Sequence, residues 1–304
     1  ASNTIVNSSM EAGPVVIFNL TDQGEKDVVI LSPFSQFMAT AFSQQANIFQ
    51  YGVFGSILQI PANYHHSMIL FYSSQGINKG IHQWGQLMKQ AYNRTDQFRL
   101  NDITLNYLGY YTDAGAYYYY NTEVGLNYQD TILSIYRNIK LPFHYIQFDS
   151  WWYYRGVKGG VSQWTSRPDV FPDGLPFLSR QLENMPLAAH NRWWAIDTIY
   201  FENYTFIMDD VNQMSLPLGN DSFWIDLLSE ASHSWGLIMY EQDWMHAQTA
   251  RFLPLITDIN LGRQWLISMG QGAEKAQITI QYCSAYPRHA LQALEIPRVT
   301  QARV

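Results

Sequence analysis

Residues 143–152 read FHYIQFDSWW, an apolar run that ends in the carboxylate Asp149 and is followed by two tryptophans. Short apolar runs rich in β-branched and aromatic residues predict β-strands. Beyond residue 100 such runs start roughly every forty residues, the length of a strand–helix unit with its loops. The predicted strands are 105–113, 143–149, 186–194, 236–244, 278–286 and 299–304.

Helical patterns separate these strands, at residues 130–140, 175–183, 222–235 and 261–276. Alternation of strands and helices predicts a parallel sheet, either open and doubly wound or closed as a (β/α)₈ barrel. No glycine-rich phosphate loop follows the first strand, which argues against a dinucleotide site. Polar side chains end five successive strands, and a barrel gathers such ends on one face. We therefore predict an α/β fold, an incomplete (β/α)₈ TIM-type barrel of about six units spanning residues 101–304.

The first part of the chain has a different pattern. Residues 1–75 contain short apolar or alternating runs punctuated by Gly, Pro, Asn and Asp, which predict an N-terminal β-sandwich. The runs are 15–18, 27–32, 51–60 and 67–73. Apolar residues at helical spacing predict a helix at residues 80–92, within a connecting segment, residues 76–100.

Composition limits the classes of function. The 304 residues are 47% apolar and 14% charged, with a net charge of −7, so the chain can bury a full core. An acidic chain lacks the basic face that nucleic acid requires, and no apolar run is long enough to span a bilayer. Aromatic residues make up 15% of the chain, and clusters of Tyr and Trp suit the walls of a partly wet ligand site. The single cysteine, Cys283, excludes an internal disulfide.

Five Asn-x-Ser/Thr sequons suggest passage through the secretory pathway, with the lysosome or the cell exterior as destination. The predicted glycosylation sites are Asn7, Asn19, Asn93, Asn203 and Asn220. The start shows no signal-peptide pattern and looks trimmed, and the end, VTQARV, stops on a strand-like run. We therefore expect the sequence to be a fragment of a longer protein that continues past Val304.

The predicted strand ends combine carboxylates, aromatic rings, a histidine and an arginine. Sugars present C–H faces to aromatic rings and hydroxyl groups to charged side chains, so this combination suits a carbohydrate. Glycoside cleavage needs two carboxyl groups on either side of the bond. Asp149 would hold sugar hydroxyls while Trp151 or Trp152 forms a wall. For any single acid the alternative is a turn residue or helix cap, and only the repetition after successive strands favours a site.

The series GYYTDAG, IQFDSWW, AAHNRWW, MYEQDW, QYCSA, VTQARV resembles the barrel of glycoside hydrolase clan D. That clan includes melibiase-type α-galactosidases, raffinose synthases and family 31 α-glucosidases. Its members also have an N-terminal β-sandwich and a connecting helix before the barrel. The resemblance covers about residues 100–304.

The resemblance implies a role for individual residues. An acid after the second strand contacts sugar hydroxyls, which matches Asp149, and the nucleophile ends the fourth strand, which matches Asp243. Cys283 matches a cysteine near the sugar at the end of the fifth strand. The acid/base follows the sixth strand and would lie just beyond Val304. This chain departs from the pattern at Glu241, where the family often has a lysine; a second carboxylate there would raise one pKa unless a cation offsets it.

Other candidates have competing explanations. His190, Arg192 and Arg303 could bind sugar hydroxyls, or Arg192 could pair with a structural acid and Arg303 could be solvated. Asp113 could line the pocket or be an ordinary turn residue. Cys283 is more readily explained as a small buried side chain than as a nucleophile. The remaining histidines lack zinc-ligand spacing, so we predict no metal and no cofactor.

The resemblance thus implies a retaining α-glycosidase that acts on oligosaccharides or glycoconjugates, and we expect this fragment alone to be inactive. The alternatives are a sugar-binding pseudoenzyme, a sugar-transferring enzyme similar to raffinose synthase, and a plain structural barrel. The sugar, the linkage and the choice between hydrolysis and transfer are left open.

Overall fold

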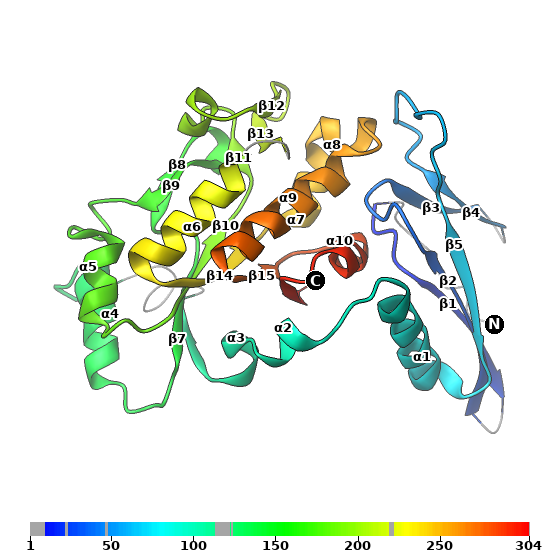
Figure 1. Cartoon of the computed structure of the whole chain (residues 1–304), viewed down its shortest axis with the longest axis horizontal. Helices are drawn as coiled ribbons and strands as arrows, with labels where there is room; N and C mark the ends of the chain where they lie inside the picture. The colour runs from blue at the N-terminus through cyan, green and yellow to red at the C-terminus, as the bar shows by residue number, and fades with distance from the viewer. Residues whose placement is uncertain are drawn as a thin grey trace.

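The strand–helix alternation beyond residue 100 forms one curled sheet of six parallel strands in the computed structural model (Figure 1). The structure describes residues 10–21, 24–45, 48–112, 122, 124–218 and 222–303. The sheet order is β16-β15-β14-β10-β7-β6, so strands adjacent in the predicted series are neighbours in space. The strands are β6 (Gly109–Tyr111), β7 (Tyr145–Phe148), β10 (Leu187–Asn191), β14 (Leu237–Gln242), β15 (Thr279–Tyr282) and β16 (Val299–Ala302). All five pairings are parallel, which confirms the predicted parallel sheet.

Four predicted helices are present and lie in the connections between these strands. They are α4 (Tyr128–Asn138), α5 (Gly174–Gln181), α6 (Phe223–Trp235) and α9 (Leu261–Ala276). α6 and α9 pack closely because Gly272 of α9 lies against the backbone of Trp224, where a Cβ atom would meet that backbone at 2.7 Å. Shorter helices follow β14 and β15, namely α7 (Met245–Arg251), α8 (Leu253–Thr257) and α10 (Pro287–Gln292), and the 3₁₀ turn η3 (Ala293–Glu295) precedes β16.

The concave side of the sheet holds a layer of polar side chains. Gln147 Nε2 donates to Glu241 Oε2 at 2.6 Å and to Gln281 Oε1 at 3.0 Å, and Gln281 donates to Gln301 at 2.7 Å. Gln301 in turn donates to Thr104 Oγ1 at 2.9 Å, just before β6. The side chains of the sixth strand therefore reach the segment that leads into the first, and the sheet is curled as a half-barrel.

Residues between β7 and α5, and between β10 and α6, form a second sheet that the sequence did not predict. Its order is β12-β13-β11-β9-β8. The strands are β8 (Tyr153–Arg155), β9 (Val161–Ser166), β11 (Trp194–Ala195), β12 (Phe206–Asp209) and β13 (Met214–Pro217), with the 3₁₀ turns η1 (Val157–Gly159) and η2 (Ile199–Glu202). Residues 186–194, predicted as one strand, are divided between β10 and β11 of the two sheets.

The N-terminal part is a β domain, although its described residues do not form a complete sandwich. β1 (Val15–Thr21), β2 (Gly24–Pro33) and β5 (Met68–Ser73) form an antiparallel sheet, and β3 (Thr40–Gln45) and β4 (Ile48–Val53) form a separate hairpin. The predicted strand 51–60 ends at Val53. α1 (Gly76–Ala91) packs on β2 through Gly80, and α2 (Gln97–Leu100) and α3 (Ile103–Asn106) lead to β6.

Arg288 joins the N-terminal domain to the half-barrel. The side chain has no exposed surface and donates to the backbone carbonyls of Met10, Met38 and Thr40, while its guanidinium lies over the ring of Phe54. Burial lowers its pKa to about 9.

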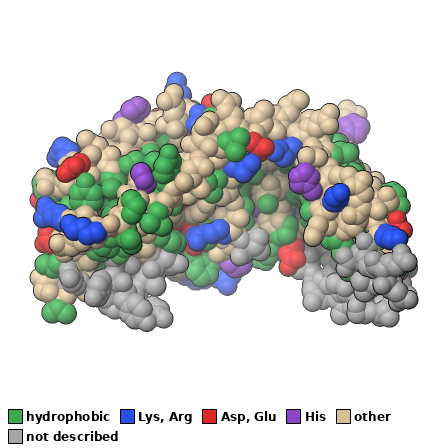
Figure 2. All heavy atoms as spheres, turned by 90° about the horizontal axis from the view of Figure 1, so that it is seen from below, with side chains coloured by type: hydrophobic (Ala, Val, Ile, Leu, Met, Phe, Trp, Pro, Cys, Tyr) green, Lys and Arg blue, Asp and Glu red, His purple; other side chains and the backbone are tan. Residues whose placement is uncertain are grey.

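Seen from below, basic side chains lie in several separate groups with acidic ones among them (Figure 2).

Candidate active site

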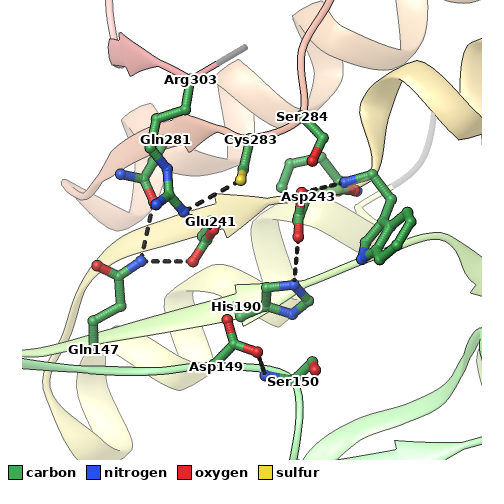
Figure 3. Close-up of polar contacts among 12 residues, drawn as sticks. Gln147, Asp149, Ser150, His190, Glu241, Asp243, Gln281, Cys283, Ser284 and Arg303 are labelled. Carbon is green, nitrogen blue, oxygen red and sulfur yellow. Dashed lines mark hydrogen bonds and ion pairs between the residues drawn. The ribbon is translucent and has the colours of Figure 1, made fainter. Parts of the chain in front are cut away.

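The carboxyl ends of the parallel strands bring several predicted site residues together (Figure 3). Asp149 follows β7, His190 lies on β10, Glu241 and Asp243 lie at the end of β14, and Cys283 follows β15. Arg303 follows β16 and reaches toward Glu241. In parallel strands these ends share one edge of the sheet, so residues far apart in sequence meet there.

The backbone at the end of β14 holds Asp243 in place. Its N–H donates to the carbonyl of Asn191 at 2.8 Å, which continues the pairing of β14 with β10. The next residue, Trp244, has a left-handed backbone with φ of 58°. This conformation is uncommon for a bulky residue and costs energy. The Trp244 N–H donates to Asp243 Oδ1 at 2.6 Å, so the turn serves to orient the carboxylate.

The other oxygen of Asp243 contacts a buried histidine. His190 Nε2 lies 3.1 Å from Asp243 Oδ2, and the imidazole has only 1% of its surface exposed. Burial alone would raise the pKa of Asp243, but hydrogen bonds from His190, Cys283 and the Trp244 N–H outweigh it and hold the pKa well below its usual range. The carboxylate therefore remains ionised near neutral pH.

Neighbouring side chains also offset the charge of Glu241. It has no exposed surface, and its two oxygens accept from Arg303 Nη2 at 2.7 Å and from Gln147 Nε2 at 2.6 Å. Burial raises the pKa of Glu241, while the electrostatic interactions with His190 and Arg303 oppose the rise. Arg303, which follows β16, is thus the cation that offsets the second carboxylate at this position.

Arg303 links three strands of the site. Besides Glu241, the same nitrogen lies 3.2 Å from Cys283 Sγ and 3.3 Å from the Tyr111 hydroxyl. Burial raises the pKa of the Cys283 thiol, with the negative charges of Glu241 and Asp243 adding to the rise, so the group remains a thiol that can donate to Asp243. Cys283 thus packs beside the carboxylates in its protonated form.

Asp149 lies on the other side of His190 in Figure 3 and is 5% exposed. Its Oδ2 accepts from the Tyr111 hydroxyl at 2.9 Å, and its Oδ1 accepts from the Ser150 N–H at 2.6 Å. The carboxylate therefore faces Tyr111 of β6, the first strand of the sheet. The predicted neighbour Asp113 lies outside the described residues.

The structure places the two predicted wall residues in the core. Trp152 has no exposed surface and packs against Trp164 and Trp235. Trp151 is 6% exposed and stacks on Tyr128 at 4.7 Å between ring centres. These side chains turn away because β8 follows at once and joins the second sheet, so neither provides the expected aromatic wall.

Arg192 takes a position that the sequence did not predict. Its guanidinium lies over the rings of Trp193 at 5.3 Å and Trp244 at 5.8 Å, and Nε is buried without a hydrogen-bond partner. Trp244, with 40% of its surface exposed, is the aromatic side chain next to Asp243 that remains accessible. The sequence indicated Trp244 as a neighbouring hydrogen-bond donor to Asp243, which its N–H is, but not as an aromatic wall residue.

Two further residues were missed. Tyr153 lies in the stretch that follows Asp149, but its role depends on the second sheet, and no sequence signal pointed to it. Gln147 could have been found, because residues two apart on a strand share a face and Gln147 precedes Asp149 by two.

His190, Glu241 and Asp243 also form the one group of potential metal ligands in the described ranges, with ligand atoms within 4.8 Å of one another. Both oxygens of Glu241 already accept hydrogen bonds, and so do both oxygens of Asp243. A guanidinium beside the group further disfavours a cation. The arrangement fits a hydrogen-bonded relay better than a metal cage.

A separate cavity of about 450 Å³ lies between β9, α5 and α6, and none of the predicted site residues lines it. Among the predicted glycosylation sites, Asn19, Asn93 and Asn203 are exposed, while Asn7 and Asn220 lie outside the described residues. In the part of the chain that the structure covers, no helix combines the length and apolarity needed to cross a membrane.

The sequence matches no protein-family model and no curated protein. The structure is similar to solved glycosidases. An α-galactosidase from Lactobacillus brevis gives a TM-score of 0.58 at 13% identity, and the GH36 α-galactosidase AgaB from Geobacillus stearothermophilus gives 0.55 at 12%. The α-N-acetylgalactosaminidase NagBb from Bifidobacterium bifidum gives 0.54 at 8%. The chain shares their fold.

These matches cover 98%, 96% and 97% of this chain. The chain spans 42%, 46% and 59% of the length of the three proteins. The similarity therefore extends over the N-terminal β domain as well as the half-barrel, and at these identities it establishes the fold alone.

Proposed function

We propose that this protein is a retaining α-glycosidase of the clan D type, with Asp243 as its nucleophile. The observation that carries the proposal is the state of Asp243. It ends the fourth parallel strand, its pKa is held well below the usual range, and both of its oxygens are oriented by hydrogen bonds. An ionised, fixed carboxylate at this position suits an oxocarbenium-like transition state.

In the proposed reaction Asp243 attacks the anomeric carbon while the bond to the leaving oxygen breaks and an acid protonates that oxygen. Water or a second sugar then displaces Asp243 with retention of configuration. Asp149 and Arg303 are proposed to bind sugar hydroxyls, because both lie at the same strand ends. Glu241 is not proposed as the acid, since it has no exposed surface and is paired with Arg303.

The substrate class is proposed from the similar structures. Variants of AgaA, another GH36 α-galactosidase with this fold, were solved in complex with stachyose and with raffinose. Oligosaccharides that carry an α-galactosyl group are therefore the first substrates to test, followed by α-glucosides.

A sugar-binding protein without activity is a second candidate. Glu241 favours this candidate. It occupies a position where clan D enzymes often have lysine, and its carboxyl group is paired with Arg303. Binding of sugars without turnover would support this candidate.

The test is Asp243→Asn in the protein expressed from its complete coding sequence, assayed on aryl α-galactosides and α-glucosides. Loss of turnover with sugar binding retained supports the nucleophile. Activity within a few-fold of wild type contradicts the assignment, and Asp149 is then the next candidate. Asp169→Asn is a matched control, because Asp169 is an exposed acid that pairs with Arg167 and is not among the predicted site residues.

We also propose passage through the secretory pathway, to the exterior or the lysosome. It is supported by the exposed sequons at Asn19, Asn93 and Asn203. Treatment of the natively produced protein with an N-glycosidase should reduce its apparent mass, and Asn203→Gln should remove part of that change. An unchanged mass contradicts the proposal.

A further inference from the structure

His190 makes a second contact on the side away from Asp243. Its Nδ1 lies 2.9 Å from the hydroxyl of Tyr153, and the two ring planes are inclined by only 10°. Tyr153 comes from β8, in the second sheet, and has no exposed surface. The site thus contains a continuous chain of polar contacts from the second sheet to the carboxylate of Asp243.

The direction of these hydrogen bonds follows from which groups can donate. A carboxylate only accepts, so Nε2 of His190 must donate to Asp243. Nδ1 can then either accept from the Tyr153 hydroxyl, in a neutral ring, or donate to it, in a charged ring. If Nδ1 donated, the buried hydroxyl proton of Tyr153 would have no acceptor in the contacts described.

The neutral arrangement gives each polar atom of this chain of contacts a partner. Tyr153 donates to Nδ1, and Nε2 donates to Asp243. A buried donor left without an acceptor costs free energy, so this order is the stable one. Burial also raises the pKa of Tyr153, which keeps the hydroxyl protonated and able to donate.

We propose that Tyr153 is a positioning residue that locks His190 in the tautomer with the proton on Nε2. The imidazole then donates permanently to Asp243 and orients its carboxylate. The proposal rests on the proposed role of Asp243 and replaces the expected contact of His190 with sugar hydroxyls. Tyr153 acts through His190 and has no exposed surface through which it could touch a sugar.

Other charged groups face this relay. Glu241 of β14 interacts electrostatically with His190, and Asp149, Arg155 and Arg192 interact with Tyr153.

The tautomer can be measured without any activity. In the chain labelled with ¹⁵N-histidine, long-range proton–nitrogen NMR distinguishes protonated from unprotonated ring nitrogens. The His190 signals are assigned by their loss in His190→Gln. We expect a protonated Nε2 and an unprotonated Nδ1 in the wild type at neutral pH. A protonated Nδ1, in the neutral or the charged ring, overturns the proposal.

Tyr153→Phe removes only the hydroxyl, and Tyr282→Phe is its matched control. Tyr282 is also buried, and its hydroxyl has no hydrogen-bond partner in the described part of the chain. Tyr153→Phe should shift the Nδ1 signal and populate a ring protonated at Nδ1, whereas Tyr282→Phe should leave both signals unchanged. Equal effects of the two variants, or no shift in Tyr153→Phe, contradict the proposal. If Tyr153→Phe does not fold, the wild-type spectrum still decides.

The kinetic test applies if the Asp243 assignment holds. Tyr153→Phe should lower kcat by roughly tenfold with little change in KM, as expected for loss of one hydrogen bond that supports the transition state. His190→Gln, which keeps an N–H donor, should retain more activity than His190→Ala. Equal losses in the two His190 variants would show that donation to Asp243 is not the role of the ring. If Asp243→Asn leaves activity intact, the proposed function fails, and the NMR result still tests the relay.

Discussion

Arg303 Nη2 lies 2.7 Å from Glu241 Oε1, so a side chain that follows the sixth strand neutralises a fully buried acid two residues before Asp243. The Arg303 side chain is itself 42% exposed. The side chain therefore extends from the buried interior of the half-barrel to the exposed carboxyl ends of the strands. An unpaired Glu241 would repel the charge on Asp243, and the pairing allows two carboxylates to lie side by side while Asp243 remains ionised.

Glu241→Gln should change how stability depends on pH. Burial raises the pKa of Glu241 above its ordinary 4.5, so its favourable contribution is fully present below pH 4.5 and is lost as the pH rises through the folded-state pKa. Glu241→Gln has no titrating group at this position, so it does not lose stability in this way as the pH rises. Its stability relative to wild type should therefore improve as the pH rises from 4 to 7, as measured by urea unfolding at each pH.

Glu274→Gln is the matched control for that experiment. Glu274 pairs with Arg298, and this hydrogen bond lowers its pKa, so its contribution is present above pH 4.5 and is lost as the pH falls. The two variants should show trends of opposite sign. Trends of the same sign would show that the burial of Glu241 does not control its titration.

Trp152→Ala should destabilise the protein by about 3–5 kcal/mol, because removing a fully buried indole leaves a cavity among aromatic rings. Phe201→Ala, at a position 50% exposed, should cost less than about 1 kcal/mol. Urea unfolding measures both. A small cost for Trp152→Ala together with weaker sugar binding would restore its predicted role as a wall.

Arg288→Met should destabilise the protein by about 3 kcal/mol or more, because three backbone carbonyls lose their donor. Hydrogen exchange should rise first in residues 34–54 of the N-terminal domain, since Arg288 binds the carbonyls of Met38 and Thr40. Arg99→Met removes an exposed pair with Asp96 and should cost less than about 1 kcal/mol. Equal effects of the two variants would contradict a joining role for Arg288.

Two glycines of α1 offer a matched pair. A Cβ at Gly80 would lie 2.4 Å from Val28 Cγ1, so Gly80→Ala should push α1 from β2 and cost about 1–3 kcal/mol. A Cβ at Gly85 meets nothing within 4 Å, so Gly85→Ala should stabilise the helix by up to about 1 kcal/mol. Thermal unfolding separates the two. A neutral Gly80→Ala would show that the helix does not pack this closely.

The order of parallel strands and helices could be predicted from the sequence because it depends on local patterns. The apolar run that ends at Asp149 forms β7, and the helical pattern at residues 261–276 forms α9, each within a few residues of its predicted bounds. Asp149, Glu241 and Asp243 could be selected for the same reason, since the ends of parallel strands converge whatever their loops do.

The tertiary structure alone decided what those side chains touch. Trp151 and Trp152 follow Asp149 directly, yet they enter the core because β8 turns at once into the second sheet. That sheet pairs short segments such as β9 and β11, far apart in sequence, which no local pattern reveals. It also brings Tyr153 to His190, and the curl of the half-barrel brings Arg303 to Glu241. A local pattern determines which residues form strands, whereas contacts between distant strands depend on how the whole chain packs.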